Sequence, residues 1–251
     1  MDSDDHEGAT VPIKLVVFDV FDTLFANTHD YWRDSFIRVC ADQKLQVEPY
    51  KLWKVWLPME REFRARRLDL ETMIPGPFES YTDVWRDCFR RAFDEMELNG
   101  DADAANDLCL SDFVNRPPFP ETLEVIAKLR GQWPMAILSN ADDSFLYPLL
   151  DRHCIADAFE QIVSSEEARS YKPHSSIYNV LLNRLNVEPS ETLMVGDTLH
   201  EDVWGSHLVG MPSAWVNRYE APMDGQVAPT YKLNSLKDLF KVLEGTDSAL
   251  R

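Results

Sequence analysis

The sequence predicts an α/β fold in which a Rossmann-like parallel sheet with helices on both faces carries an inserted α-helical cap domain. Three short apolar runs predict the sheet, and each ends in a small or acidic polar residue: residues 15–18 before Asp19, 135–138 before Ser139, and 193–195 before Gly196. Continuous runs of this length are typical of strands that are buried on both faces. Stretches with helical spacing separate these runs, and this alternation indicates a parallel sheet.

The other elements of the expected core follow from periodicity and end signals. Helical spacing predicts helices over residues 121–130, 175–185 and 235–243, with Asn234 as the N-cap of the last. Residues 213–217 (SAWVN) predict a further strand.

Residues 27–116 differ from the rest because they combine helical periodicity with little strand character. Three apolar stripes at helical spacing predict helices there, and Pro58 is expected to break the second. The proline-rich residues 117–120 (PPFP) close the insert. We therefore expect a helical cap over 27–116 and a core built from 11–26 plus 117–251. The acidic, polar residues 1–10 are expected to be a disordered tail.

Composition restricts the classes of partner. The 251 residues hold 25 Lys and Arg against 43 Asp and Glu, a formal net charge of −18. Such a surface repels phosphate backbones and anionic lipids, so neither nucleic acid nor a membrane is expected as a partner. Four scattered cysteines without a CxxC pair favour reduced thiols and a cytoplasmic setting. A monomer or homodimer is expected.

Polar side chains at the ends of the predicted strands should meet, because ligands bind beyond the carboxyl ends of strands in open parallel sheets. A carboxylate at Asp19 could attack an electrophile. The acids Asp197 and Asp202 could hold a hard cation. Short hydrogen-bond donors and one cation complete the expected group: Thr23, Ser139, Asn140 and Lys172.

The chain resembles the haloacid dehalogenase (HAD) superfamily in four motifs that occur in order. They are residues 19–24 (DVFDTL), 137–140 (ILSN), 172–173 (KP) and 196–202 (GDTLHED). Together they span nearly the whole chain, and the helical insert resembles that family's cap domain.

The resemblance implies a role for each matching residue. Asp19 would attack a phosphate monoester and form an aspartyl-phosphate that water then opens. Mg²⁺ would be held by Asp19, the main-chain carbonyl of Phe21 and Asp197, with Asp202 orienting a metal water or Lys172. Lys172 would fix Asp19 and screen the phosphoryl oxygens. The hydrogen-bond donors to the developing charge would be Thr23, Ser139 and Asn140.

One position departs from the phosphatases of the superfamily. They usually carry an acid/base aspartate two residues after the nucleophile, where this chain has Phe21. Haloacid dehalogenases have a non-acid there but usually lack the metal-binding GD that Gly196 and Asp197 provide here. Three interpretations follow: a Mg²⁺-dependent hydrolase of a small phosphorylated metabolite, which the metal motif favours; a 2-haloacid dehalogenase; and a catalytically impaired binding protein, for which Phe21 is the motivation.

The cap is expected to select a small anionic substrate. Arg64 belongs to a cluster with Arg61, Arg66 and Arg67, and we expect it to reach the substrate while most of the cluster forms a solvated helix face. Tyr178 matches a tyrosine of the dehalogenases and is a second candidate for substrate binding. Three tryptophans on the apolar stripes are expected to lie in the cap core: Trp53, Trp56 and Trp85.

Overall fold

The computed structural model describes residues 12–67, 73–223 and 227–248, and the expected tail over 1–10 lies outside them. A six-stranded, wholly parallel sheet forms the core, with strand order β3-β2-β1-β4-β5-β6. The strands are β1 (Leu15–Phe18), β2 (Met135–Ser139), β3 (Gln161–Ser164), β4 (Thr192–Gly196), β5 (Ser213–Val216) and β6 (Tyr231–Leu233). The predicted parallel sheet is confirmed, and β1, β2, β4 and β5 coincide with the expected runs.

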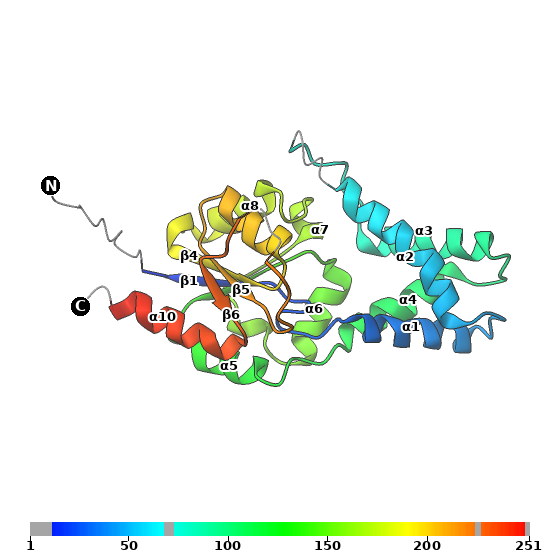
Figure 1. Cartoon of the computed structure of the whole chain (residues 1–251), viewed down its shortest axis with the longest axis horizontal. Helices are drawn as coiled ribbons and strands as arrows, with labels where there is room; N and C mark the ends of the chain where they lie inside the picture. Colours follow the sequence, from blue (N-terminus) through cyan, green and yellow to red (C-terminus); the bar gives the residue numbers. More distant parts are fainter. Residues whose placement is uncertain (1–11, 68–72, 224–226, 249–251) are drawn as a thin grey trace.

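Helices cover both faces of the sheet, as predicted (Figure 1). Alternate residues of β1 point to opposite sides: Val16 and Phe18 join the core beneath α5 (Thr122–Leu129), α6 (Asp143–Arg152) and α10 (Leu239–Ser248). Leu15 and Val17 join the core beneath α8 (Ser175–Leu185). This period of two explains why the strands read as unbroken apolar runs.

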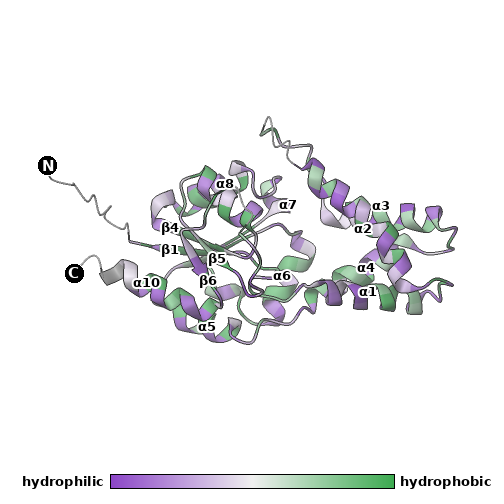
Figure 2. Cartoon of the chain, in the orientation of Figure 1, coloured by the Kyte–Doolittle hydropathy of each residue, from purple (hydrophilic) through white to green (hydrophobic). Residues whose placement is uncertain are grey.

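Four helices fill the interval between β1 and α5, and they extend to one side of the sheet (Figure 1). They are α1 (His29–Asp42), α2 (Pro49–Arg66), α3 (Tyr81–Glu95) and α4 (Ala102–Val114). Fully buried aromatic rings such as Trp56 and Trp85 form their shared core, and Figure 2 shows their mixed hydropathy. The expected break at Pro58 is wrong, because α2 continues through that residue.

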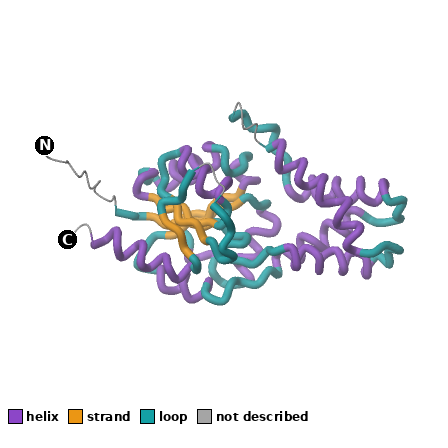
Figure 3. Tube along the Cα trace, viewed as in Figure 1, coloured by secondary structure: helices purple, strands orange, loops and turns teal. Residues whose placement is uncertain are grey.

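Short helical segments complete the chain (Figure 3). They are η1 (Ala156–Ala158), α7 (Ser165–Ala168), η2 (Pro189–Glu191), η3 (Leu199–Trp204), α9 (Gly205–Leu208) and η4 (Leu236–Asp238). The N-cap of the last segment is Ser235 and not Asn234, since Ser235 and Asp238 form a reciprocal capping box. Among the described residues, none of the helices has the length and apolarity that crossing a bilayer requires.

Candidate active site

Three neighbouring strands deliver the expected polar residues to one edge of the sheet. Asp19 follows β1, Ser139 ends β2 and Asp197 follows β4, and β1 lies between the other two strands. The backbone N–H of Asp19 donates to the carbonyl of Val195 at 2.9 Å, which holds the start of this loop against β4. The Ser139 hydroxyl lies 3.5 Å from Asp19 Oδ1, so it is a donor directed at the carboxylate.

Lys172 joins two of the acids. Its Nζ donates to Asp19 Oδ1 at 2.7 Å and to Asp202 Oδ1 at 2.6 Å, and its side chain is only 1% exposed. Burial disfavours the ammonium form, but the Asp19 and Asp202 carboxylates outweigh this cost and raise the pKa of Lys172 well above its usual value. Lys172 therefore stays charged and fixes the orientation of Asp19.

The acids themselves are crowded. Oxygen atoms of Asp19, Asp197 and Asp202 all lie within 4.8 Å of one another. Burial raises the pKa of Asp19, and burial together with the charges of Asp19, Asp202 and Asp22 raises the pKa of Asp197 well above its usual value. Burial likewise raises the pKa of Asp202 to about 7, against the opposing effect of Lys172. This accumulation of negative charge favours a bound cation.

The loop after β4 is shaped around Asp202. A Cβ atom at Gly196 would overlap the Asp202 carboxylate, so the glycine gives this side chain its room. The other oxygen of that carboxylate, Oδ2, accepts a hydrogen bond from the backbone N–H of Thr198 at 3.0 Å. With Oδ1 bonded to Lys172, Asp202 acts mainly as a support for the lysine and the loop.

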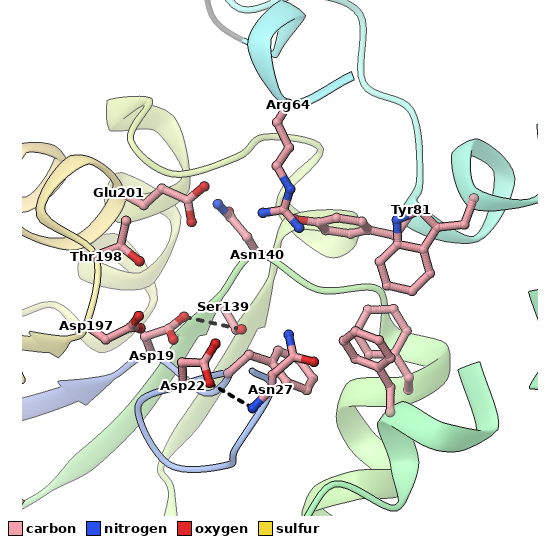
Figure 4. Close-up of a pocket in the computed structure, with 14 residues that line it drawn as sticks. Asp19, Asp22, Asn27, Arg64, Tyr81, Ser139, Asn140, Asp197, Thr198 and Glu201 are labelled. Atoms are coloured by element: carbon pink, nitrogen blue, oxygen red, sulfur yellow. Dashed lines mark hydrogen bonds between the residues drawn. The ribbon is translucent and has the colours of Figure 1, made fainter. Parts of the chain in front are cut away.

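A cavity of about 130 Å³ lies above these groups (Figure 4). The carboxyl ends of the strands form its polar floor, and Arg64 reaches it from the insert. Aromatic side chains form the facing wall: Phe21, Tyr81, Trp85, Phe113 and Phe145. Phe21 packs edge-on against Phe113 with ring centroids 5.1 Å apart, so an apolar ring and no carboxylate occupies the position two residues after Asp19.

Thr23 and Asn140 lie at the site, and their side chains form hydrogen bonds to other residues of the site. The Thr23 hydroxyl donates to Asp197 Oδ1 at 3.0 Å, so in this structure it holds an acid and does not face an anion. The Asn140 amide donates to the Lys172 carbonyl at 3.1 Å, and its oxygen accepts the Lys172 backbone N–H at 2.8 Å. Asn140 thus anchors the lysine segment while it also lines the cavity.

Tyr178 is placed otherwise than expected. Its side chain is fully buried on α8, and its hydroxyl donates to the Glu201 carbonyl. A Cβ atom at Gly205 would meet the Tyr178 hydroxyl, so the glycine makes the space for this ring. Tyr178 does not line the cavity, because the α8 face that carries it packs on the sheet.

The arginine cluster divides between solvent and interior. Arg64 lines the cavity as expected, and its guanidinium pairs with the buried Glu60. Arg66 pairs with Glu79 at 2.8 Å on the surface. Arg67 does not belong to the solvated face, because its guanidinium is buried over the rings of Phe63, Tyr81 and Tyr171 at 4.0–4.5 Å.

Sequence reasoning assigned no role here to several residues that line the cavity. Glu201 directs its carboxylate toward Arg64 and Asn140 in Figure 4, and its negative charge contributes to the raised pKa of Asp19. Asp22 adopts a left-handed backbone with φ of 62°, and its carboxylate accepts the Asn27 N–H at 2.8 Å. Both residues lie inside the motif segments. A single sequence gives no pattern that distinguishes such an acid, next to a motif acid, from an ordinary surface acid.

A haloacid dehalogenase-like hydrolase family model matches residues 13–210. The chain belongs to the haloacid dehalogenase-like hydrolases. It is therefore a hydrolase with the fold and family that its motifs predict, and the prediction of membership is confirmed.

Individual relatives of this HAD hydrolase have different activities in their names. (S)-2-haloacid dehalogenase 1 of Pseudomonas sp. strain CBS-3 is 26% identical over 92% of this chain and 97% of its own length. Pyrimidine 5′-nucleotidase YjjG of Escherichia coli is 30% identical over 50% of this chain, a match that spans 56% of that protein. The magnesium-bound HAD-hydrolase YfnB of Bacillus subtilis shares the fold, with a TM-score of 0.74 and 20% identity over 92% of this chain and 99% of that structure.

Proposed function

We propose that this protein is a Mg²⁺-dependent hydrolase of small phosphate monoesters that acts through an aspartyl-phosphate on Asp19. The observation that carries the proposal is the cluster of Asp19, Asp197 and Asp202, whose oxygens lie within 4.8 Å of one another in a buried setting. Lys172 offsets one negative charge of the three. A divalent cation would offset the remainder.

The donor set fits magnesium, which prefers carboxylate and carbonyl oxygens. Asp19 and Asp197 would hold the ion together with the main-chain carbonyl of Phe21, while Asp202 supports Lys172. When bound, Mg²⁺ would supply positive charge that offsets the repulsion between the Asp19 carboxylate and an anionic phosphoryl group. The magnesium-bound structure of YfnB, which shares this fold, supports the choice of ion.

The chain's own nucleophile and solvent account for the covalent steps. An Asp19 oxygen forms a bond to phosphorus as the ester P–O bond breaks, and the electron pair leaves with the alcohol oxygen, which takes up a proton from water because Phe21 supplies no acid. Water then attacks the phosphorus of the aspartyl-phosphate, which releases inorganic phosphate and restores the carboxylate. Lys172 keeps Asp19 oriented through both steps, and Ser139 donates a hydrogen bond at the same edge.

A second candidate, 2-haloacid dehalogenation, is favoured by Phe21 and the aromatic wall. Asp19 would attack the carbon that carries the halogen, and the halide would leave without a proton, so no acid is needed at position 21. Water would then hydrolyse the resulting ester. The resemblance to (S)-2-haloacid dehalogenase 1 over 92% of the chain supports this candidate.

One experiment separates the two candidates. The enzyme is incubated with para-nitrophenyl phosphate and with 2-chloropropionate, each with Mg²⁺ or with EDTA, and phosphate and chloride are assayed. We expect phosphate release that EDTA abolishes and Mg²⁺ restores. Chloride release that EDTA does not affect would instead support the dehalogenase and overturn our first choice.

A further inference from the structure

A second cavity, of about 460 Å³, opens between helices α1 and α2 of the insert. We call it the tryptophan groove, and its walls include Trp32, Trp53, Trp56, Leu57, Arg61 and Arg64. It adjoins the cavity above Asp19, because Asp22, Asn27 and Arg64 line both. A molecule that reacts at Asp19 can therefore extend into the groove.

The two cavities differ in size and in chemistry. The cavity above Asp19 holds about 130 Å³, whereas sites that enclose a whole metabolite-sized ligand usually hold roughly 300–1,000 Å³. The small cavity suits the reacting group alone. The groove provides the additional volume that a larger leaving group requires.

The groove presents flat aromatic surface together with hydrogen-bond donors. Trp56 is a core residue at 1% exposed, whereas Trp32 and Trp53 are only partly buried. The Trp53 ring lies at the groove beside the exposed His29, with ring centroids 5.6 Å apart. Partly exposed indoles that line a cavity can stack on planar rings.

The two arginines of the groove differ in their ion pairs. Arg64 pairs with the buried Glu60, whose exposed fraction is 4%. Arg61 is exposed and forms no ion pair with any residue that the structure describes. Its guanidinium can therefore donate to acceptor atoms on a ligand without first breaking a bond within the protein.

We infer that the tryptophan groove binds the leaving group of the substrate and selects one that contains a planar aromatic or heteroaromatic ring with hydrogen-bond acceptors. The ring would stack on Trp53 and Trp32, and its acceptors would face Arg61. This inference rests on the proposed phosphate ester hydrolysis and deepens it, since it names the class of alcohol released.

A matched substrate pair tests the inference. Nucleoside 5′-monophosphates and ribose 5-phosphate carry the same primary phosphate ester and differ by the aromatic base. We expect wild-type kcat/KM to be at least about tenfold higher for the nucleotides, because stacking of one base on an aromatic side chain supports a preference of that order. Trp53→Leu should reduce this ratio to about two, chiefly by lowering kcat/KM for the nucleotides.

Controls make the result specific to the groove. Trp133→Leu removes a partly buried tryptophan at the start of β2, the opposite end of the sheet, and should keep the wild-type ratio. Arg61→Ala should also lower the ratio of nucleotide to ribose 5-phosphate kcat/KM, because it removes the hydrogen-bond donor to the base and leaves the apolar packing of the groove unchanged. Equal kcat/KM for both substrates in the wild type, or a ratio unchanged in Trp53→Leu, would overturn the inference.

A binding measurement separates failure of the groove from failure of the proposed function. Calorimetric titration with nucleosides, which carry no phosphate, needs no turnover. Saturable binding that weakens about tenfold in Trp53→Leu supports the groove even if neither phosphate ester is hydrolysed. The inference is contradicted if the wild-type protein binds no nucleoside at millimolar concentration and hydrolyses both esters equally well. That outcome would still support the proposed phosphatase function.

Discussion

The ammonium group of Lys172 lies 2.7 Å from Oδ1 of Asp19, although the two residues are 153 positions apart in sequence. Both side chains are buried, so the pair is protected from solvent screening. The lysine also bonds Asp202, and Asn140 anchors its backbone. The Asp19 carboxylate is thus held by a network that joins the carboxyl ends of β1 and β2 to η3.

Lys172→Met should be strongly destabilising as well as inactivating. The change leaves the Asp19 and Asp202 carboxylates buried without their partner, which typically costs about 3–5 kcal/mol of unfolding free energy. Urea denaturation measures this loss. Lys128→Met, which removes an exposed lysine paired with Glu124, is the matched control and should leave the urea midpoint unchanged. A Lys172→Met midpoint equal to that of the control would contradict the network.

Asp19→Asn should abolish turnover while the fold is retained. The amide cannot act as the nucleophile, and loss of a covalent nucleophile costs about 10⁴-fold or more in kcat. Steady-state assays of the purified variant measure the effect, and circular dichroism checks that the fold is retained. Activity within tenfold of the wild type would exclude both the phosphatase and the dehalogenase.

The free energy of unfolding of the metal-free protein should fall as pH rises toward the raised pKa of Asp202. Burial raises the pKa of Asp202 from its usual 3.8 to about 7, so protonation favours the folded state. The contribution is therefore fully present below about pH 4 and is lost as pH rises to about 7. Melting temperatures in EDTA between pH 4 and pH 8 measure this, and Asp202→Asn should show a shallower decline. Mg²⁺ should stabilise the wild type more at pH 8 than at pH 5. Identical slopes for wild type and variant would contradict the assignment.

Phe21→Asp should increase phosphatase activity toward esters with poor leaving groups. Positioned general acids contribute about 10²–10⁴-fold, and an alkoxide needs a proton more than para-nitrophenolate does. We expect a rise of at least about tenfold for an alkyl phosphate and little change for para-nitrophenyl phosphate. Comparison of kcat for the two esters measures it. A fall for both esters, with the fold intact, would indicate that the aromatic ring itself is needed.

Much of the sheet could be predicted from sequence because β1, β2 and β4 are buried on both faces and therefore contain unbroken apolar runs. Strand β3 is harder to recognise, since Gln161–Ser164 begins and ends with polar residues at an edge of the sheet. Strand β6 has three residues and only its last is buried. Neither length nor pattern separates such segments from loops.

The candidate site divides in the same way. Residues that end strands converge because the topology of a parallel sheet requires it, so Asp19, Ser139 and Asp197 were within reach of sequence reasoning. How deeply a helical side chain is buried could not be predicted in this way. Periodicity assigns Tyr178 to the apolar face of α8, but it does not show that Gly205 leaves the space in which the Tyr178 ring is buried, away from the cavity. Likewise, only the packing of Tyr81 and Tyr171 reveals why Arg67 leaves the solvated cluster.

Trapping the intermediate tests the central claim most directly. The enzyme is mixed with Mg²⁺ and a phosphate monoester labelled in its phosphoryl group, quenched in acid during turnover, and digested for peptide mass spectrometry. We predict the label on the carboxylate of Asp19. Label on another residue, or phosphate released with no labelled protein at any quench time, would contradict the account.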